Sequence, residues 1–492
     1  MTERAPLPQG PSIARTDATG RDAMLPELLA WTTSLALDRQ MEREDLLGSA
    51  AHVTMLHKVG LIAADDARKL RASLLAMYDE AVAGTLAFPD GEEDVHMAIE
   101  SRLTAELGDV GKRLHAARSR NDQVATTLRL HVRDQGKQTL GEIASLVLEL
   151  ADRAAREVDV VLPAYTHRQR AQPVSAAFVI CAWALGLLRA GDAVTTAVAR
   201  ANESPLGCGA CSGTSLPIDR DIVAELLQFH GVTVNALDTI GDRDFVLDWS
   251  WAGARVLLAL SRLATDVIDY TTSEFGFLKI GDAIAAGSSM MPQKKNPDVF
   301  ELVRAKTARC VGNVAAMLTL VKGLSTGYAR DLQDDRQGVL DTGPLVRGAV
   351  RAVRAAIVHL TFDEERCLRA VAAGPTQATD VAEALVRKGL PFRDAYKATG
   401  QLVHLAAERG LDLGAVPLDL ARTVHAAFDE GVLAVLDPRA AVAAKRSAGG
   451  TAKERVEEQI RWIRAAATEL SYKAAAVPPL DDLRRAIEAE AI

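Results

Sequence analysis

Aromatic residues are scarce in this sequence: they make up only 4% of its 492 residues, although 48% of the residues are hydrophobic. The apolar part is dominated by alanine, leucine and valine, which suits closely packed long helices better than sheets. A chain of this length exceeds what one hydrophobic core usually serves, so we expect two or three domains. The composition therefore favours an all-α protein with a large core.

Cysteine is scarce as well. The five cysteines are an odd number, scattered along a chain without an export signal, which favours reduced thiols in a cytoplasm. Cys208 and Cys211 have the spacing of a redox or zinc half-site, but neither a second cysteine pair nor a histidine cluster accompanies them. We therefore expect neither disulfides nor a metal site, and we interpret this pair as a coincidence in a glycine-rich turn.

Charge of one sign is not concentrated anywhere. The formal net charge of -8 is spread along the chain, which does not indicate nucleic-acid or membrane-surface binding and favours a small-molecule or protein partner. Met1–Leu25 lacks the apolar core of a signal peptide, so we expect a mobile arm there. The longest uncharged stretch, Ala171–Leu188, is interrupted by Gln172, Pro173 and Ser175. This stretch predicts a buried helix instead of a membrane anchor, and the protein is expected to be cytoplasmic.

Long helical segments separated by short runs of glycine, proline and serine dominate the middle of the chain, which is typical of helix bundles. The sequence predicts five long helices, at Val124–Val158, Val174–Ala201, Phe245–Phe277, Asp298–Leu324 and Val339–Leu360. Shorter helical regions flank them. We therefore expect three domains: an N-terminal helical domain at 1–117, a central bundle at 118–367 and a C-terminal helical domain at 368–492.

The third predicted helix is apolar on more than one face. One face holds Val256, Leu260, Leu263, Val267 and Tyr270. Other positions hold Trp251, Leu257, Leu258 and Ile268. A helix that is apolar nearly all round must be buried, and the bundle of one chain cannot easily bury so many faces. The pattern predicts an oligomer whose subunits share a core.

The most unusual segment is Gly287–Pro297, which crowds small, hydroxyl, cationic and amide residues between two apolar helices. Loops of this kind carry function, and Lys294 and Lys295 would bind a carboxylate and lower the pKa of a nearby hydroxyl. The composition fits a solvated turn with surface lysines equally well. Neither a phosphate-binding glycine-rich loop nor a Gly-x-Ser-x-Gly elbow occurs, so a nucleotide or acyl-enzyme mechanism lacks support.

A second polar segment, His115–Gln123, places hydrogen-bond donors immediately before a long helix, where free backbone N–H groups and the helix dipole favour anions. It is a candidate carboxylate site. The alternative is a helix N-cap formed by Ser119, Asn121 or Asp122, with solvated arginines, which is the commoner outcome for such a segment alone.

Two histidines are further candidates. His167 lies in the polar segment Tyr165–Pro173, where an imidazole can exchange protons near neutral pH. His96 precedes Glu100 by four residues, so a simple pair on a helix surface is the alternative for that position. Metal ligation by His96 is disfavoured.

Together these segments resemble the fumarase/aspartase superfamily, whose signature loop Gly-Ser-Ser-x-Met-Pro-x-Lys-x-Asn-Pro is matched from Gly287 to Pro297. Within the superfamily, the sequences of segments 118–123, 169–173 and 242–245 are similar to those of the argininosuccinate lyase family. This similarity extends from about Ser34 to Ile460. The resemblance implies an all-α, three-domain subunit and a homotetramer around a twenty-helix core. It also implies active sites each built from three subunits, with no metal and no organic cofactor.

The resemblance implies an anti elimination that releases fumarate: a proton leaves the carbon beside a carboxylate, and the C–N bond then breaks. Ser288 matches the general base, while Lys294 and Asn296 match the residues that stabilise the charged carboxylate. His167 matches the histidine that protonates the departing nitrogen, and Glu301 matches its partner. The succinyl carboxylates are held at positions matched by Ser119, Arg120, Asn121 and Thr166. His96 matches a further histidine of the family's site. The positions that hold the leaving group are matched by Ser34, Tyr328, Gln333 and Arg336.

Several positions depart from the family's usual text. Arg168 stands where the family has an apolar residue, Arg336 replaces a lysine, and Ala116–Ala117 and Ala285–Ala286 replace more polar or more flexible pairs. Arginine keeps the charge of lysine but presents a planar fork instead of a point charge. These changes bear on the leaving group more than on the chemistry. The expected substrate is argininosuccinate; the alternatives are another N-substituted aspartate, such as ethylenediamine disuccinate, or a non-catalytic, crystallin-like structural protein.

Overall fold

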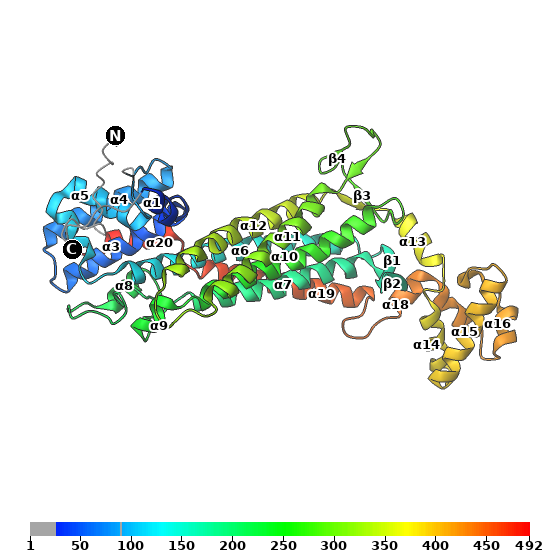
Figure 1. The fold of residues 1–492 in the computed structure, drawn as a ribbon. Helices are drawn as coiled ribbons and strands as arrows, with labels where there is room; N and C mark the ends of the chain where they lie inside the picture. Colours follow the sequence, from blue (N-terminus) through cyan, green and yellow to red (C-terminus); the bar gives the residue numbers. More distant parts are fainter. Residues whose placement is uncertain (1–25, 89–90) are drawn as a thin grey trace.

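The structure, a computed structural model, describes residues 26–88 and 91–492, so the arm expected at Met1–Leu25 lies outside the described residues. The subunit is elongated and mostly helical, with a central bundle and a group of shorter helices at each end (Figure 1). The all-α class expected from the sequence is confirmed.

The central bundle contains all five predicted helices, with ends shifted by a few residues. They are α6 (Arg120–Arg156), α7 (Ala176–Arg200), α10 (Asp244–Thr271), α11 (Asp298–Val321) and α12 (Asp335–Ile357). A sixth long helix, α19 (Lys453–Ala475), packs along α6 and α7 although it follows some 95 residues after α12. The apolar face predicted for α10 is buried from Val256 to Tyr270, as expected for a core helix.

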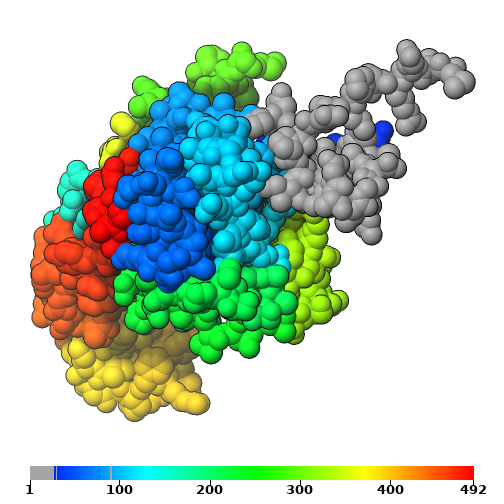
Figure 2. Space-filling model, turned by 90° about the vertical axis from the view of Figure 1, so that its left-hand side faces the viewer, coloured from blue at the N-terminus to red at the C-terminus, as the bar shows by residue number. Residues whose placement is uncertain are grey.

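Shorter helices form a layer at one end of the bundle (Figure 1). They are α1 (Pro26–Thr32), α2 (Leu35–Asp38), η2 (Arg39–Met41), α3 (Glu42–Lys58), α4 (Ala64–Ala83), α5 (Val95–Leu107), η3 (Gly108–His115), α8 (Arg220–Leu226) and α9 (Ala236–Gly241). Figure 2 shows α20 (Leu480–Ala489), in red, against the blue N-terminal helices. The contact includes a hydrogen bond from Tyr78 Oη to Asp481 Oδ1 (2.7 Å).

A small helical unit projects from the opposite end of the bundle and has its own core around Leu385, Leu402 and Phe428. Its helices are α14 (Ala378–Arg387), α15 (Phe392–Glu408), η5 (Leu413–Ala415), α16 (Leu418–Val424), α17 (Glu430–Leu433) and η6 (Ala434–Leu436). Two further helices, α13 (Glu364–Ala372) and α18 (Pro438–Ala443), flank this unit and pack against β1 and β2. The domain boundaries at 117 and 367 stay predictions, and the chain after this unit returns to the bundle through α19.

Three two-stranded antiparallel ribbons occur in the described part of the chain. The ribbon β1 (Val161–Thr166) with β2 (Gln169–Ser175) connects α6 to α7, and β4 (Ala286–Gly287) with β5 (Lys295–Asn296) brackets the signature loop. The third pairs β3 (Leu278–Ile280) with β6 (Leu360–Phe362). A single turn of 3-10 helix, η4 (Arg330–Asp334), leads into α12.

Within the described residues, α7 is the one helix long and apolar enough to meet the length and composition of a membrane span. Its most apolar 18-residue window is 56% buried inside the subunit. Partial burial of this kind is typical of a core helix in a bundle, which is the role predicted for the stretch around Ala171–Leu188.

Candidate active site

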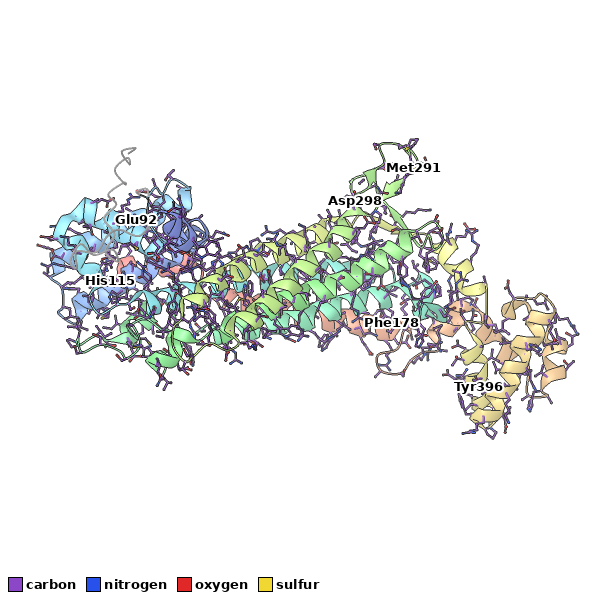
Figure 3. The ribbon with its side chains drawn as sticks, in the orientation of Figure 1. Glu92, His115, Phe178, Met291, Asp298 and Tyr396 are labelled. Carbon is purple, nitrogen blue, oxygen red and sulfur yellow. The ribbon has the colours of Figure 1, made fainter. Side chains whose placement is uncertain are left out.

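The predicted site residues lie in three groups at the two ends of the bundle. Figure 3 shows His115 among the N-terminal helices and both Met291 and Asp298 at the far end. The N-terminal group comprises Ser34, His96, Ser119, Arg120, Asn121, Tyr328, Gln333 and Arg336. The hairpin group comprises Thr166 and His167 of β1–β2, and the loop group comprises Ser288, Lys294, Asn296 and Glu301.

His96, on α5, is buried and paired with an acid from another helix. Its Nδ1 lies 2.8 Å from Oδ1 of Asp45 on α3. The alternative of a helix-surface pair with Glu100 is wrong, because the Glu100 carboxylate lies 3.4 Å from His115 instead. Asp45 also accepts hydrogen bonds from Gln123 Nε2 (2.9 Å) on α6, so one carboxylate joins α3, α5 and α6.

The charges around His96 determine its protonation. Burial alone would lower its pKa, but the carboxylates of Asp45, Asp94 and Asp38 raise the pKa above its usual value. Burial would raise the pKa of Asp45, and the imidazolium opposite holds it below its usual value. Both shifts favour the charged forms, an imidazolium at His96 facing a carboxylate at Asp45, at the N-terminal end of the site.

Ser34 is positioned through a second buried ion pair. Its Oγ donates to Asp38 Oδ2 (2.6 Å), and Asp38 Oδ1 lies 2.5 Å from Arg336 Nε. Asp38 and Arg336 are 0% and 3% exposed, so each compensates the other's charge within one chain. Burial raises the pKa of Asp38, and the nearby guanidinium opposes that shift. Arg336, which stands where the family has a lysine, therefore helps to hold Ser34 in place through Asp38.

Ser119 and Asp122 cap α6. The Ser119 side chain accepts from the backbone N–H of Asn121 (3.3 Å), and the Ser119 N–H donates to Asp122 Oδ1 (3.0 Å), which completes a capping box. Ser119 is therefore the N-cap of α6, and Asp122 is the N3 acid of its capping box. Arg120 is not simply solvated: its Nη1 lies 3.1 Å from Asp94 Oδ2. Asn121 Nδ2 donates to the carbonyl of Ala210 (2.9 Å).

The cysteine-containing turn supports the same helix end. The second oxygen of Asp122 accepts the backbone N–H groups of Gly207 (2.9 Å) and Gly209 (2.7 Å), on either side of buried Cys208. Burial raises the pKa of Asp122 to about 6. No group of three or more metal-ligating side chains occurs among residues 26–88 and 91–492. The turn thus presents amides to Asp122.

Tyr328 and Gln333 lie in and after the loop that leads to η4. Gln333 Nε2 donates to the carbonyl of Thr32 (2.9 Å), which ties this segment to the end of α1. Tyr328 is half-buried, and burial raises the pKa of its phenol. Both therefore lie with Ser34 and Arg336 at the N-terminal end of the bundle.

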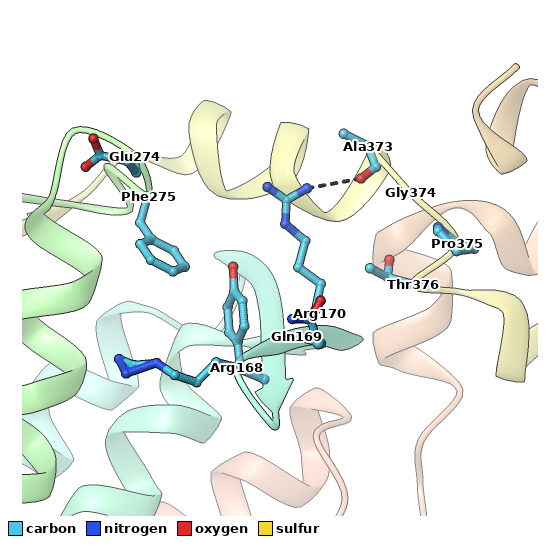
Figure 4. A pocket seen from close by; sticks show the side chains of 10 residues that line it. Arg168, Gln169, Arg170, Glu274, Phe275, Ala373, Gly374, Pro375 and Thr376 are labelled. Atoms are coloured by element: carbon cyan, nitrogen blue, oxygen red, sulfur yellow. Dashed lines mark hydrogen bonds between the residues drawn. The ribbon is translucent and has the colours of Figure 1, made fainter. Parts of the chain in front are cut away.

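Thr166 and His167 lie at the exposed tip of the β1–β2 hairpin. Thr166 pairs with Gln169, which leaves His167 and Arg168 as a two-residue turn. Both have positive φ, 53° and 59°. A cavity of about 490 Å³ lies beside this hairpin, between it and the segment that joins α13 to α14 (Figure 4).

The signature loop stands on the β4–β5 ribbon, where Gly287 pairs with Lys295. Ser288 Oγ accepts hydrogen bonds from the backbone N–H groups of Met290 (3.3 Å) and Met291 (3.1 Å). Both lysines are exposed, but Lys295 forms an ion pair with Asp282, whereas no ion pair to an acid of the described residues occupies Lys294. Of the two lysines, Lys294 is therefore the one placed to meet an external carboxylate.

Asn296 and Glu301 complete the loop group. Asn296 pairs with Ala286 in the ribbon, and exposed Glu301 lies in the first turn of α11. Among the described residues, no hydrogen bond or ion pair joins Glu301 to His167 within one chain.

The three groups cannot meet within one chain. Ser119 precedes α6 and the hairpin follows it, and a helix of 37 residues is about 55 Å long at 1.5 Å per residue. The N-terminal group is therefore separated from the hairpin by the length of the bundle. A site that uses all three groups requires more than one subunit.

Sequence reasoning missed the acids that hold these residues. Asp38 lies four residues after Ser34, Asp45 lies in the charged first turn of α3, and Asp94 lies two residues before His96. Each is almost completely buried. Charged residues are rarely fully buried unless paired, so Asp38, which follows the apolar run Leu35–Leu37, carried a signal, whereas Asp45 stands among other charged residues and carried none.

Comparisons with known proteins place this geometry in a class. The model of the family described as "Lyase" matches residues 22–312, and that of "Argininosuccinate lyase C-terminal" matches residues 375–443. The solved structure of an EDDS lyase in complex with formate has a TM-score of 0.83 and 25% identity, over 95% of each chain. The fold and the loop thus define a lyase of the fumarase/aspartase superfamily.

Full-length relatives narrow the class. An argininosuccinate lyase of Synechococcus sp. (strain JA-3-3Ab) is 42% identical over 480 residues, covering 96% of this chain and 97% of that protein. Argininosuccinate lyase 2 of Shouchella clausii (strain KSM-K16) is 41% identical over 424 residues, covering 86% and 92%. The chain belongs to the argininosuccinate lyase family, a family of carbon–nitrogen lyases.

Proposed function

We propose that the protein catalyses the reversible anti elimination of argininosuccinate to arginine and fumarate. The observation that carries the proposal is the Ser288 hydroxyl, which accepts two backbone N–H groups beside exposed Lys294. Hydrogen bonds donated to an oxygen stabilise its deprotonated form. The substrate is inferred from relatives named argininosuccinate lyase, which are about 40% identical over most of the chain.

Ser288 serves as the general base in this mechanism. Its alkoxide takes the proton from the carbon beside a succinyl carboxylate, and that carboxylate then carries extra negative charge. Lys294 and Asn296 stabilise this charge by preorganised electrostatic contacts. Closure of the loop over the substrate excludes water, which strengthens these contacts.

His167 protonates the departing nitrogen, and Glu301 of another subunit orients the imidazole. Such proton transfer contributes a factor of roughly 10²–10⁴ in rate. The succinyl carboxylates are held by Ser119, Arg120, Asn121 and Thr166. The leaving group is held by Ser34, Tyr328, Gln333 and Arg336, and His96 adds its positive charge. No metal or organic cofactor takes part.

We propose a homotetramer around a twenty-helix core, with each active site built from three subunits. The separation of about 55 Å along α6 supports this, because only neighbouring chains can bring the groups together. Exposed apolar side chains on α10 and α11 support it as well. They are Trp251, Leu258, Leu302, Val311 and Leu318. We further propose that the enzyme works in the cytoplasm.

The alternative substrate is another N-substituted aspartate, such as ethylenediamine disuccinate. The likeness to an EDDS lyase structure favours testing it, although the identity is only 25%. Fumarate is supplied with arginine, with ethylenediamine or with other amines, and adduct formation is measured. Consumption of fumarate with arginine alone supports argininosuccinate; consumption with a diamine alone overturns that assignment.

Substitution of the base tests the mechanism. Ser288→Ala is expected to abolish fumarate release from argininosuccinate, followed by absorbance, while substrate binding measured by calorimetry is retained. Ser289→Ala, the adjacent serine, is the matched control. Near-normal turnover by Ser288→Ala would exclude this base. A wild-type protein without fumarate release from any of these substrates would instead support the crystallin-like, non-catalytic alternative.

A further inference from the structure

Arg168 is the departure closest to the proton donor, and its side chain is engaged within its own chain. Its Nη2 forms an ion pair with Oδ2 of Asp269 on α10. Figure 4 shows Arg168 leaving the hairpin on the side of the green helix α10, in a different direction from Arg170. The guanidinium therefore has a partner that does not involve substrate.

The hairpin tip needs an external anchor. His167 and Arg168 both occupy the left-handed region, at φ 53° and 59°. Two-residue hairpin turns of this kind favour Asn-Gly, because other side chains are strained there. The identities of these two residues therefore do not secure the turn that carries the His167 imidazole.

Contacts further down secure the strands but not the tip. The Tyr165 ring packs edge-on against Phe275 at 5.5 Å, and Arg170 Nη1 donates to the carbonyl of Ala373 (3.0 Å; Figure 4). These contacts lie in the second register pair from the turn, Tyr165 with Arg170. The pair between Arg168 and Asp269 is made by the turn itself.

Asp269 has its own reason to attract a cation. It lies in the last turn of α10, where the helix dipole disfavours negative charge, and that turn contains no basic residue. Asp266 lies one turn earlier, and Trp183 Nε1 donates to it (2.8 Å). Arg168 supplies the missing positive charge at this helix end.

We propose that Arg168 is a positioning residue, whose ion pair with Asp269 fixes the hairpin tip on α10 and thereby the His167 imidazole. This rests on the proposed role of His167 in leaving-group protonation. On this proposal, the arginine at position 168, where the family has an apolar residue, serves to place the proton donor His167 and does not select the substrate. Asp269 becomes part of the same device.

A double-mutant cycle tests the assignment, with wild-type fumarate release from argininosuccinate measured first. Arg168→Gln and Asp269→Asn are each expected to lower kcat by about two- to fivefold, the range of an exposed ion pair, with KM unchanged. The double variant is expected to be no slower than the slower single variant, because both changes break one contact. Asp269→Glu is expected to recover most of the loss.

The control is Asp152→Asn, which removes an exposed partner of Arg464 (2.7 Å) on the outside of the bundle and should leave kcat unchanged. A raised KM in Arg168→Gln with an unaffected Asp269→Asn would overturn the proposal in favour of substrate contact by Arg168. Independent, multiplicative losses, or no loss in either single variant, would overturn it as well. Absence of turnover in the wild type would instead reject the proposed function.

Discussion

Two buried imidazoles in the N-terminal helices have opposite electrostatic surroundings. His96 faces carboxylates, which raise its pKa. His52 is completely buried beside the Arg118 guanidinium; burial and this cation lower the pKa of His52 to about 3. His52 is therefore neutral in the native protein, and its Nε2–H donates to the carbonyl of Ala116 (2.9 Å).

His52 predicts acid sensitivity in a defined pH window. In the unfolded chain His52 binds a proton below about pH 6.5, whereas native His52 binds one only near pH 3. The free energy of unfolding therefore decreases as the pH is lowered from about 6.5 to about 3. The slope is about 1.4 kcal/mol per pH unit. His52→Gln keeps a donor for Ala116 without titrating. Its Tm is expected to change less than that of the wild type between pH 6.0 and 5.0.

The control for this prediction is His404→Gln, an exposed histidine on α15, which should keep the wild-type slope. Thermal unfolding followed by circular dichroism gives both slopes. An unchanged pH dependence in His52→Gln would contradict the neutral, buried state.

At this scale the sequence predicted residues with motifs and missed those that act by burial. His96 and Ser34 were found by resemblance, whereas their partners Asp45 and Asp38 were not. The pairing of His96 with Asp45 spans 51 residues, and local periodicity contains no information on such long-range contacts. The role of Arg336 was therefore expected at the leaving group, without the pairing to Asp38.

At the scale of elements, close packing of α10, α11 and α12 depends on a glycine. A Cβ on Gly253 would lie 2.3 Å from Thr342 Cγ2 of α12 and 3.4 Å from Cys310 Sγ of α11. Gly253→Ala is expected to lower stability by about 1–3 kcal/mol, because overpacked cores must shift backbone or side chains. Chemical denaturation of the purified variant measures the loss.

The matched control is Gly348→Ala on α12, where a Cβ meets nothing within 4 Å. Removing a helical glycine without a clash should stabilise by up to about 1 kcal/mol. Equal effects of the two substitutions would show that helix propensity, and not the contact of α10 with α12, dominates at Gly253.

The elements themselves were largely predictable, because apolar periodicity specifies a helix from local residues. The five central helices and the buried face of α10 were found in this way. The packing of α19 along α6 was not, because an amphipathic helix does not specify which partner covers its apolar side. The short β4–β5 ribbon is only two residues per strand, too short for any alternation to indicate it.

At the scale of the whole molecule, the site residues of one chain are distributed over both ends of a long bundle. Variants that each lack a residue of a different group should therefore complement one another. Ser288→Ala and Arg120→Met are each expected to be inactive alone. When equal amounts of the two are unfolded and refolded together, activity per site is expected to recover to about a quarter of the wild-type value. The reason is that random assembly gives about one site in four both native residues, Ser288 from one chain and Arg120 from another.

The control is Ser288→Ala refolded with Lys294→Met. Both changes lie in the same loop, so every loop in the mixed oligomers carries one of the two substitutions and no site contains an intact loop. Fumarate release after refolding is the measurement. Failure of the first pair to recover activity, with mixed oligomers present, would contradict the distribution of each site over several chains.

The contact of α20 with the N-terminal helices also has a consequence for biosynthesis. Tyr78 and Asp481 are 403 residues apart in sequence, yet they share a hydrogen bond in the layer that holds His96 and Asp45. At a translation rate of roughly 5–20 residues per second, Tyr78 leaves the ribosome about 20–80 s before its partner. During that time the nascent N-terminal helices expose the surface that α20 later covers, so this layer is completed only after nearly the whole described chain has been synthesised.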